Sequence, residues 1–307
     1  MIDLQLAAEE YLAIRRALGF KLRGHDRLLT DYLDVLAAET AMPVITTASA
    51  VAWAVAPAGL RPVRYAQRLC VVRGFARYAH ALDSCHDVPP LDVLSCRRGR
   101  SLPYLFSDAE IEALVAATAA LRPVLRAATY RGVFGLLAVS GMRVGEVIAL
   151  DDGDVDLDAG VLHIREAKFG KYRRLPLHST TVAALQEYAE VRRRSCPHVQ
   201  AVSFFVSTRG TRLIYQCVRA TFAGLLADAG ITAQPGGGTP KIHSLRHSFA
   251  VATLRDSYRA GLDVMATLPA LSAYMGHAHP ASTYWYVSAA PDLLALAAQR
   301  LEQAGQR

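Results

Sequence analysis

Apolar residues recur at every third or fourth position in four stretches of the first part of the chain. This spacing predicts amphipathic helices over residues 4–18, 25–39, 47–55 and 62–82. Thr46 and Thr47 offer an N-cap to the third helix. Pro62 stands in the first turn of the fourth, where a missing N–H leaves no helical bond unmade. Residues 1–88 are therefore predicted to form a small all-helical domain.

The fourth helix interleaves its apolar positions with a series of arginines, namely Arg61, Arg64, Arg68, Arg73 and Arg77. Residues 89–106 follow, opened by two prolines and made basic by Arg97, Arg98 and Arg100. Such a stretch predicts an extended linker between domains. A basic helix and a basic linker suit a chain that lies along DNA phosphates. A solvated helix face and an ordinary linker would produce the same pattern.

A capping-box pattern at Ser107 and Glu110 marks the start of a second domain. Helices are predicted over 108–120, 124–139 and 142–150, and Ser140–Gly141 is a stop signal for the second of them. The period then shortens to that of strands at 155–157, 161–164 and 174–177, with turns at 158–160 and 168–171. Helical spacing returns at 180–193, 214–229 and 291–303.

These elements predict a mainly α fold with a small antiparallel β-sheet, an α+β protein. Its predicted parts are a helical DNA-binding domain (1–88), a basic linker (89–106) and a catalytic domain (107–307) that ends in the helix 291–303. The length of 307 residues agrees with two domains, and a composition that is 52% hydrophobic excludes a disordered chain.

Charge and cysteine content narrow the class of protein. The net charge of +7 favours a polyanionic partner such as nucleic acid, although a modest excess of arginine also serves solubility alone. The five cysteines are odd in number and form no CxxC pair, which argues against a disulfide framework and a zinc ribbon and fits a reducing cytoplasm. The chain shows no signal core and no apolar run long enough to span a bilayer, so we expect a cytoplasmic protein without a membrane partner.

The candidate chemistry is a phosphate grip joined to a nucleophile. His243 and Arg246 lie three residues apart, on one face of a predicted helix, and offer donors to phosphate oxygens. Arg143 follows a glycine turn at a helix start, which suits an anion. Lys168 on a hairpin could deliver a proton. Tyr286 could attack a phosphodiester to give a phosphotyrosine, which keeps the bond energy and needs neither metal nor ATP.

Each of these residues also has an ordinary structural role when it is considered singly. A lone arginine usually forms a surface ion pair, and a lone histidine on an apolar face is usually a satisfied core residue. Tyr284, Trp285 and Tyr286 could form an aromatic cluster. The joint order of arginine, lysine, HxxR, histidine and tyrosine is much harder to obtain by chance.

This order resembles that of the tyrosine recombinases, the phage-integrase family. Four segments are similar to its motifs: SGMRVGE at 140–146, AKFGK at 167–171, HSLRH at 243–247, and MGH at 275–277 with Met in place of the usual Leu. Tyr286 lies nine residues past His277, the family's spacing for its nucleophile. The resemblance is detailed from residue 107 to 307. Residues 1–88 match the core-binding domain in size and helical character, and residues 283–289 look most like members carried on bacterial transposons and plasmids.

The resemblance implies a role for each site residue. Arg143, His243, Arg246 and His277 would hold the non-bridging phosphate oxygens. Lys168 would protonate the leaving 5′ hydroxyl, and Tyr286 would form the 3′-phosphotyrosine. Glu146 would support Arg143, and His247 would pack beside the site. Tyr284 and Lys171 are the alternatives for the nucleophile and the acid. The DNA contacts expected outside the site are Arg64, Arg68, Arg73, Arg97 and Arg98.

The resemblance also implies a partner and an assembly. The two domains would clamp duplex DNA bearing paired inverted repeats, and the helix 291–303 would dock on a neighbouring protomer in a tetramer, unless it packs within its own domain. No cofactor is expected. The alternatives are a catalytically silent DNA-binding partner, a type IB topoisomerase-like activity, and a metal-dependent hydrolase using His243, His247, His277 and His279. The hydrolase is disfavoured because the chain has no HExxH.

Overall fold

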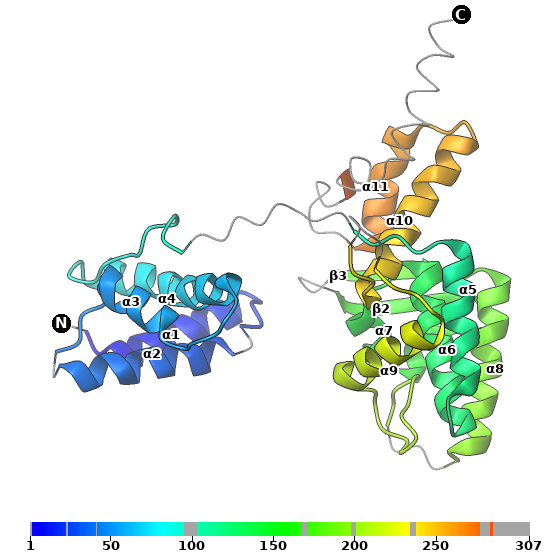
Figure 1. Cartoon of the computed structure of the whole chain (residues 1–307), viewed down its shortest axis with the longest axis horizontal. Coiled ribbons are helices and arrows are strands. Elements are labelled where there is room, and N and C mark those ends of the chain that lie inside the picture. The colour runs from blue at the N-terminus through cyan, green and yellow to red at the C-terminus, as the bar shows by residue number, and fades with distance from the viewer. Residues whose placement is uncertain are drawn as a thin grey trace, which may run out of the picture. The chain divides into compact units, whose positions relative to one another are not determined.

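The fold is that of a computed structural model of the chain (Figure 1). The structure describes residues 2–22, 24–40, 42–94, 103–167, 171–197, 201–233, 238–276 and 283–284. The chain forms two compact units, Met1–Arg100 and Ser101–Arg307, and each has a hydrophobic core of its own.

The first unit is helical at the four predicted positions. Its helices are α1 (Leu4–Ala17), α2 (His25–Glu39), α3 (Thr47–Val55) and α4 (Pro62–Leu82). The Asp3 carboxylate caps α1 by accepting the N–H groups of Gln5 and Leu6, and Thr46 caps α3 as its sequence predicts. The apolar faces of the four helices meet in one core, which includes Leu29, Tyr32, Trp53 and Phe75.

The first helix of the second unit begins with the predicted capping box. Ser107 Oγ accepts the N–H of Glu110 at 3.2 Å, and Glu110 Oε2 accepts the N–H of Ser107 at 2.7 Å. The helices are α5 (Asp108–Ala117), α6 (Val124–Ser140), α7 (Val144–Ala149), α8 (Ser179–Ser195), α9 (Tyr215–Asp228), α10 (Ile242–Arg259) and α11 (Val264–Met275). The predicted helix 108–120 is thus divided, because a 3₁₀ turn, Thr118–Ala120, follows α5.

The core of the second unit forms around α6. This helix lies between α5 and α8 and also packs against α10 (Figure 1). It contributes Val133, Phe134 and Leu137, all at most 2% exposed, and these meet Phe205 and Phe222 from later segments. A helix with this much buried surface fixes the position of whatever follows its last turn.

The small sheet is antiparallel in the order β1–β2–β3, which confirms the predicted class of fold. Its strands are β1 (Val155–Asp156), β2 (Val161–Ala167) and β3 (Lys171–Pro176). The hairpin of β2 and β3 is longer than predicted, because Arg165 and Arg173 interrupt the apolar pattern while the backbones continue to pair.

The predicted linker 89–106 is packed at both of its described ends. Arg73 donates to the carbonyls of Pro89 (2.8 Å) and Pro90 (2.7 Å), which holds this end against α4. Tyr104 and Phe106 belong to the core of the second unit, and the N–H of Phe106 donates to Ser248 Oγ at 2.7 Å. The rest of the predicted linker, 95–102, lies outside the described residues.

Three further expectations concern the C-terminal helix, membrane spans and the cysteines. The predicted C-terminal helix 291–303 lies outside the described residues. Among the residues that are described, no helix is both long and apolar enough to cross a membrane. The cysteines in that part of the chain, Cys70, Cys85, Cys196 and Cys217, are free thiols.

Candidate active site

The end of α6 sets the position of Arg143. The helix stops at Ser140, and Gly141 adopts a left-handed conformation with φ of 57°. A side chain at Gly141 would collide with the ring of Phe249, so only glycine fits this turn. Two residues later Arg143 is the N-cap residue of α7. The turn therefore places the arginine at a helix start, as the SGMR segment predicts.

Glu146 ties Arg143 to the sheet. Its Oε2 accepts the backbone N–H of Arg143 at 2.9 Å, and its Oε1 accepts Nη1 of the same residue at 2.9 Å. The guanidinium of Arg173 on β3 adds bonds of 2.8 and 3.2 Å to the two carboxylate oxygens. Burial by itself raises the pKa of Glu146, but the bonds from Arg173 and Arg143 outweigh it and leave the pKa below its ordinary value. Glu146 is therefore held as a carboxylate between two guanidiniums.

Arg246 on α10 is almost fully buried, with 2% of its surface exposed. Its Nη1 donates to the carbonyl of Gly141 at 2.5 Å and its Nη2 to that of Met275 at 2.8 Å. These bonds join the end of α6 to the end of α11. They also fix the guanidinium in one orientation, which an electrostatic site requires.

His243 lies one turn before Arg246 on α10. Packing around its ring lowers the pKa of His243, and the charges of Arg246 and Arg143 lower it further, although part of the residue stays exposed to solvent. His243 is therefore neutral near pH 7 and offers one N–H donor in place of a third charge. The ring of His247 packs edge-on against the ring of His243, with centroids 4.6 Å apart.

Both predicted arginines meet at the C-terminal end of α11. Arg143 Nη2 donates to the carbonyl of Gly276 at 2.9 Å, next to the Met275 carbonyl that Arg246 holds. His277 is the next residue in the chain. The structure thus brings Arg143 and Arg246 together at the MGH segment, with Glu146 bonded to Arg143 and His243 one turn before Arg246.

Three predicted catalytic residues, Lys168, His277 and Tyr286, lie outside the described residues. The last residue of β2 is Ala167 and the first of β3 is Lys171, and Lys168 stands between these two in the sequence. The alternative nucleophile, Tyr284, is described and is 43% exposed. The assignments of the acid and of the nucleophile remain predictions.

Comparison with known proteins decides the family. The profile of the phage integrase family matches residues 105–292. The chain belongs to the phage integrase family. As a member, it is a tyrosine-type site-specific recombinase. The matched range contains every predicted catalytic residue.

Individual relatives extend the likeness over the whole recombinase. The y4rB protein of Sinorhizobium fredii, provisionally named an integrase/recombinase, is 42% identical over 310 residues, with 99% of this chain and 98% of the relative covered. The tyrosine recombinase XerC of Pelotomaculum thermopropionicum is 30% identical over 233 residues, with 74% and 71% covered. The similarity to y4rB therefore includes the residues of the N-terminal helical unit.

Solved structures show the same fold. XerH recombinase bound to its difH substrate matches with a TM-score of 0.65 at 19% identity, over 99% of this chain and 84% of XerH. The Tn1549 transposon integrase, in complex with transposon right end DNA, matches with a TM-score of 0.65 at 17% identity, over 98% and 100%.

Sequence reasoning missed Arg173 of this recombinase. The side chain is 11% exposed and shares Glu146 with Arg143. Tyr172, Arg173 and Arg174 are all polar, so these three residues taken alone do not show which of them points inward. The available signal was the spacing from Leu175: residues two apart in a strand lie on the same face, so Arg173 shares the face of this buried leucine.

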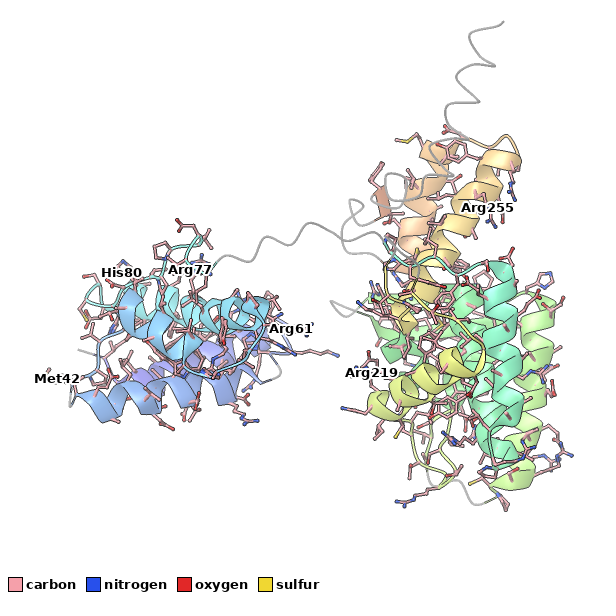
Figure 2. The ribbon with its side chains drawn as sticks, in the orientation of Figure 1. Met42, Arg61, Arg77, His80, Arg219 and Arg255 are labelled. Atoms are coloured by element: carbon pink, nitrogen blue, oxygen red, sulfur yellow. The ribbon has the colours of Figure 1, made fainter. Side chains whose placement is uncertain are left out.

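The basic residues expected to contact DNA fall into two groups. Arg64 and Arg77 of α4 are exposed, and so is Arg61, the N-cap residue, which Figure 2 shows extending from the N-terminal end of this helix. Arg68 stacks on Trp53, with its Cζ 3.8 Å from the ring centroid, and Arg73 is 7% exposed with its donors on backbone carbonyls. These two hold the unit together, and we place no DNA phosphate against Arg73. Arg97 and Arg98 lie outside the described residues.

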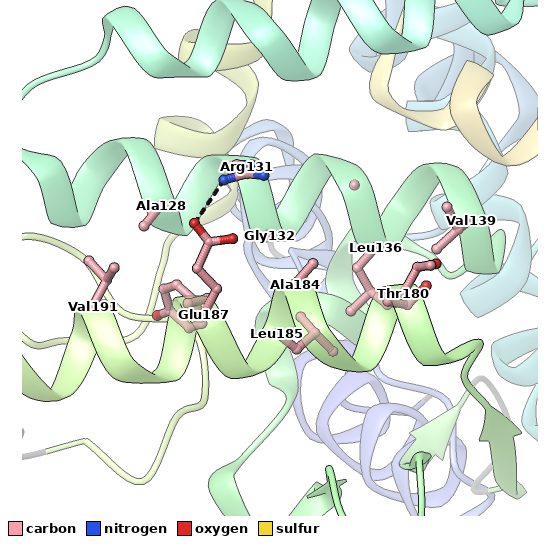
Figure 3. Close-up of a pocket in the computed structure, with 13 residues that line it drawn as sticks. Ala128, Arg131, Gly132, Leu136, Val139, Thr180, Ala184, Leu185, Glu187 and Val191 are labelled. Carbon is pink, nitrogen blue, oxygen red and sulfur yellow. Dashed lines mark hydrogen bonds and ion pairs between the residues drawn. The ribbon is translucent and has the colours of Figure 1, made fainter.

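A groove between α6 and α8 lies apart from the candidate site (Figure 3). Small and apolar side chains line it, among them Ala128, Leu136 and Ala184, and an ion pair of 3.1 Å joins Arg131 to Glu187 across it. This lining offers no cluster of donors for a phosphate. The groove is therefore not part of the catalytic centre.

Proposed function

We propose that this recombinase cuts and rejoins duplex DNA through a 3′-phosphotyrosine at Tyr286, without metal or ATP, in the integration or excision of a mobile element. The observation that carries the proposal is the convergence of Arg143 and Arg246, from elements far apart in the chain, on neighbouring carbonyls at the end of α11, with His243 one turn before Arg246 on α10. Two fixed guanidiniums and one neutral imidazole form a preorganised site for a phosphate that gains negative charge.

The proposed reaction is a balanced exchange of esters. The phenol oxygen of Tyr286 attacks the phosphorus, its proton passes to solvent or a nearby base, and the bond to the 5′ oxygen breaks. Lys168 gives a proton to that oxygen as it leaves. Rejoining runs the steps in reverse with a 5′ hydroxyl as the nucleophile. Arg143 and Arg246 stabilise the pentavalent phosphate in both directions, and His243 and His277 donate further hydrogen bonds.

Covalent capture tests the assignment of the nucleophile. Nicked duplexes that trap the protein would be selected from a random-sequence library, because a nick lets the cut fragment leave and makes cleavage irreversible. We expect wild-type protein to form an adduct stable to denaturant. Tyr286→Phe should form none while binding the same duplex, and Tyr284→Phe should behave as wild type. An adduct with Tyr286→Phe but not with Tyr284→Phe would move the nucleophile to Tyr284.

The same assay separates the competing functions. A catalytically silent partner would bind DNA without any adduct in the wild type. A metal-dependent hydrolase would lose cleavage in excess EDTA and leave no phosphotyrosine. A type IB topoisomerase-like enzyme would relax supercoiled plasmid without pairing two sites. A recombinase exchanges strands between two captured sites in the presence of EDTA, and this is the outcome we expect.

The proposed assembly is a tetramer on two sites, each an inverted repeat, in the cytoplasm of the host cell. The solved lambda integrase structures include a dimer on a core site and a tetramer on a Holliday junction, which supports the proposal by analogy of fold. We propose that the segment 291–303 links the protomers. Removing residues 291–307 should leave binding to one site intact and prevent the tetramer, as measured by sedimentation with the captured duplex.

A further inference from the structure

Arg173 is an arginine of the hairpin that points into the unit. Its neighbours on β3 are exposed, Tyr172 at 77%, but its own side chain is 11% exposed. Both terminal nitrogens of the guanidinium donate to Glu146, Nη2 to Oε2 at 2.8 Å and Nη1 to Oε1 at 3.2 Å. A paired contact of this kind sets the orientation of a carboxylate more strictly than one bond does.

The same guanidinium also lies against the end of α11. A Cβ atom added at Gly276 would come within 2.7 Å of Arg173 Nη1 and 3.0 Å of its Cζ, so the guanidinium occupies the space that a side chain there would need. Gly276 has a φ of 68°, and its carbonyl accepts the bond from Arg143. Arg173 therefore contacts both groups that hold Arg143, the Glu146 carboxylate and the residue before His277.

Stability alone gives a weak reason for such a contact. Replacing a buried ion pair by apolar side chains is often neutral or stabilising, because two charges leave water. The Nε of Arg173 is moreover buried and makes no hydrogen bond among the described residues, which lowers the stability of the folded state. Unfavourable local contacts of this kind are expected at functional sites.

We propose that Arg173 is a positioning residue for strand cleavage, which orients Arg143 through Glu146 and supports the chain that leads to His277. The proposal rests on the function proposed above. Without Arg173, Glu146 keeps its bonds to Arg143 but loses the partner that holds it from the sheet. Arg143 then no longer meets the phosphate in one fixed geometry, and a displacement of about 1 Å in such a group can reduce a rate by about 100-fold.

The test is single-turnover cleavage of the captured nicked duplex at saturating protein. We compare Arg173→Gln, Arg173→Lys, Glu146→Gln and the double variant Arg173→Gln/Glu146→Gln. Arg174→Gln is the matched control, since it removes the same charge from the exposed face of the same strand. We expect Arg173→Gln to slow cleavage by about 100-fold with unchanged DNA affinity and unchanged final adduct yield. Arg173→Lys should be intermediate, because an ammonium keeps the charge but lacks the planar pair of donors that fixes the orientation of the carboxylate.

The double variant decides whether Arg173 acts through Glu146. We expect it to be no slower than the slower single variant, because both substitutions break one chain of contacts. A merely structural role would reduce the final adduct yield and leave the rate of the folded fraction unchanged, which would overturn the proposal. A rate for Arg173→Gln equal to that of Arg174→Gln, or defects that multiply in the double variant, would also overturn it. If wild-type protein forms no adduct, the proposed function fails instead.

Discussion

Arg246 has two roles: it is proposed to hold the phosphate, and it also joins three helices of the fold. A buried guanidinium needs acceptors for its donors, and the carbonyls of Gly141 and Met275 provide two of them. Both carbonyls follow or end a helix, where they lack helical partners. The residue thus fastens α6, α10 and α11 at one point.

Truncation of Arg246 should therefore lower stability as well as activity. We expect Arg246→Ala to reduce the free energy of unfolding by about 3 kcal/mol, because two buried carbonyls lose their donors. Denaturation in urea measures this change. Arg259→Ala in the last turn of the same helix is the control, since Arg259 is exposed, and should change stability by less than about 1 kcal/mol. Equal effects of the two substitutions would contradict the role of Arg246 in joining the ends of α6 and α11.

The residues of the site were predictable to different degrees. His243 and Arg246 stand in one helix, so their spacing alone places them on one face. The meeting of Arg143 with the end of α11 depends on how distant elements pack, and no local pattern contains that information. Arg173 was missed because a polar strand in sequence does not reveal which of its charges has a buried partner.

At the scale of elements, the α6–α7 turn depends on a pair of glycines with different requirements. Gly141 has a positive φ and no room for a side chain, whereas Gly145 has nothing within 4 Å of an added Cβ. Gly141→Ala should lower the free energy of unfolding by about 3 kcal/mol, through backbone strain and overpacking. Gly145→Ala should raise it by up to about 1 kcal/mol, since alanine is the better helix former. Thermal unfolding of the two variants tests the opposite signs.

The anchor of the segment after α4 depends on another single side chain. Arg73 donates to the carbonyls of Pro89, Pro90 and Val93, which holds this stretch against the helix. We expect Arg73→Ala to release it and to speed chymotrypsin cleavage near Leu91 and Leu94 by about tenfold, because hydrogen bonds from a charged group contribute about 1.5–3 kcal/mol.

Arg77→Ala is the control for this prediction, because Arg77 lies on the same helix and is exposed. Its cleavage pattern, mapped by mass spectrometry, should match that of the wild type. If both variants are cut at the wild-type rate, Arg73 does not hold the segment.

Most of the helices and strands were predictable from the hydrophobic pattern. The four N-terminal helices and the capping box at Ser107 follow local rules, and the structure confirms them. The ends of β2 and β3 were harder to predict, because strands are extended by pairing with a neighbour even where the apolar alternation stops. The 3₁₀ turn after α5 also depends on packing that the helical spacing does not show.

At the scale of the whole molecule, a net charge of +7 suits DNA, but the arginines of α4 are not equivalent. If Arg64 neutralises a phosphate, Arg64→Gln should reduce the slope of log affinity against log salt by about 0.9. Arg73→Gln should leave the slope unchanged, because its guanidinium is buried on carbonyls. Titration of a duplex at several salt concentrations measures both slopes, and an equal loss in the two variants would contradict this division.

The two hydrogen bonds from Arg246 to backbone carbonyls affect the choice of a variant that binds DNA without cutting it. Substituting Arg246 would remove a proposed phosphate contact and would also weaken the junction of α6, α10 and α11, so a complex captured with such a variant would contain a destabilised protein. The hydroxyl of Tyr286 is a better atom to delete. If Tyr286 is the nucleophile, as proposed, phenylalanine at that position removes one oxygen atom, leaves the bonds of Arg246 to the Gly141 and Met275 carbonyls in place, and yields an inert complex suited to structural and binding work.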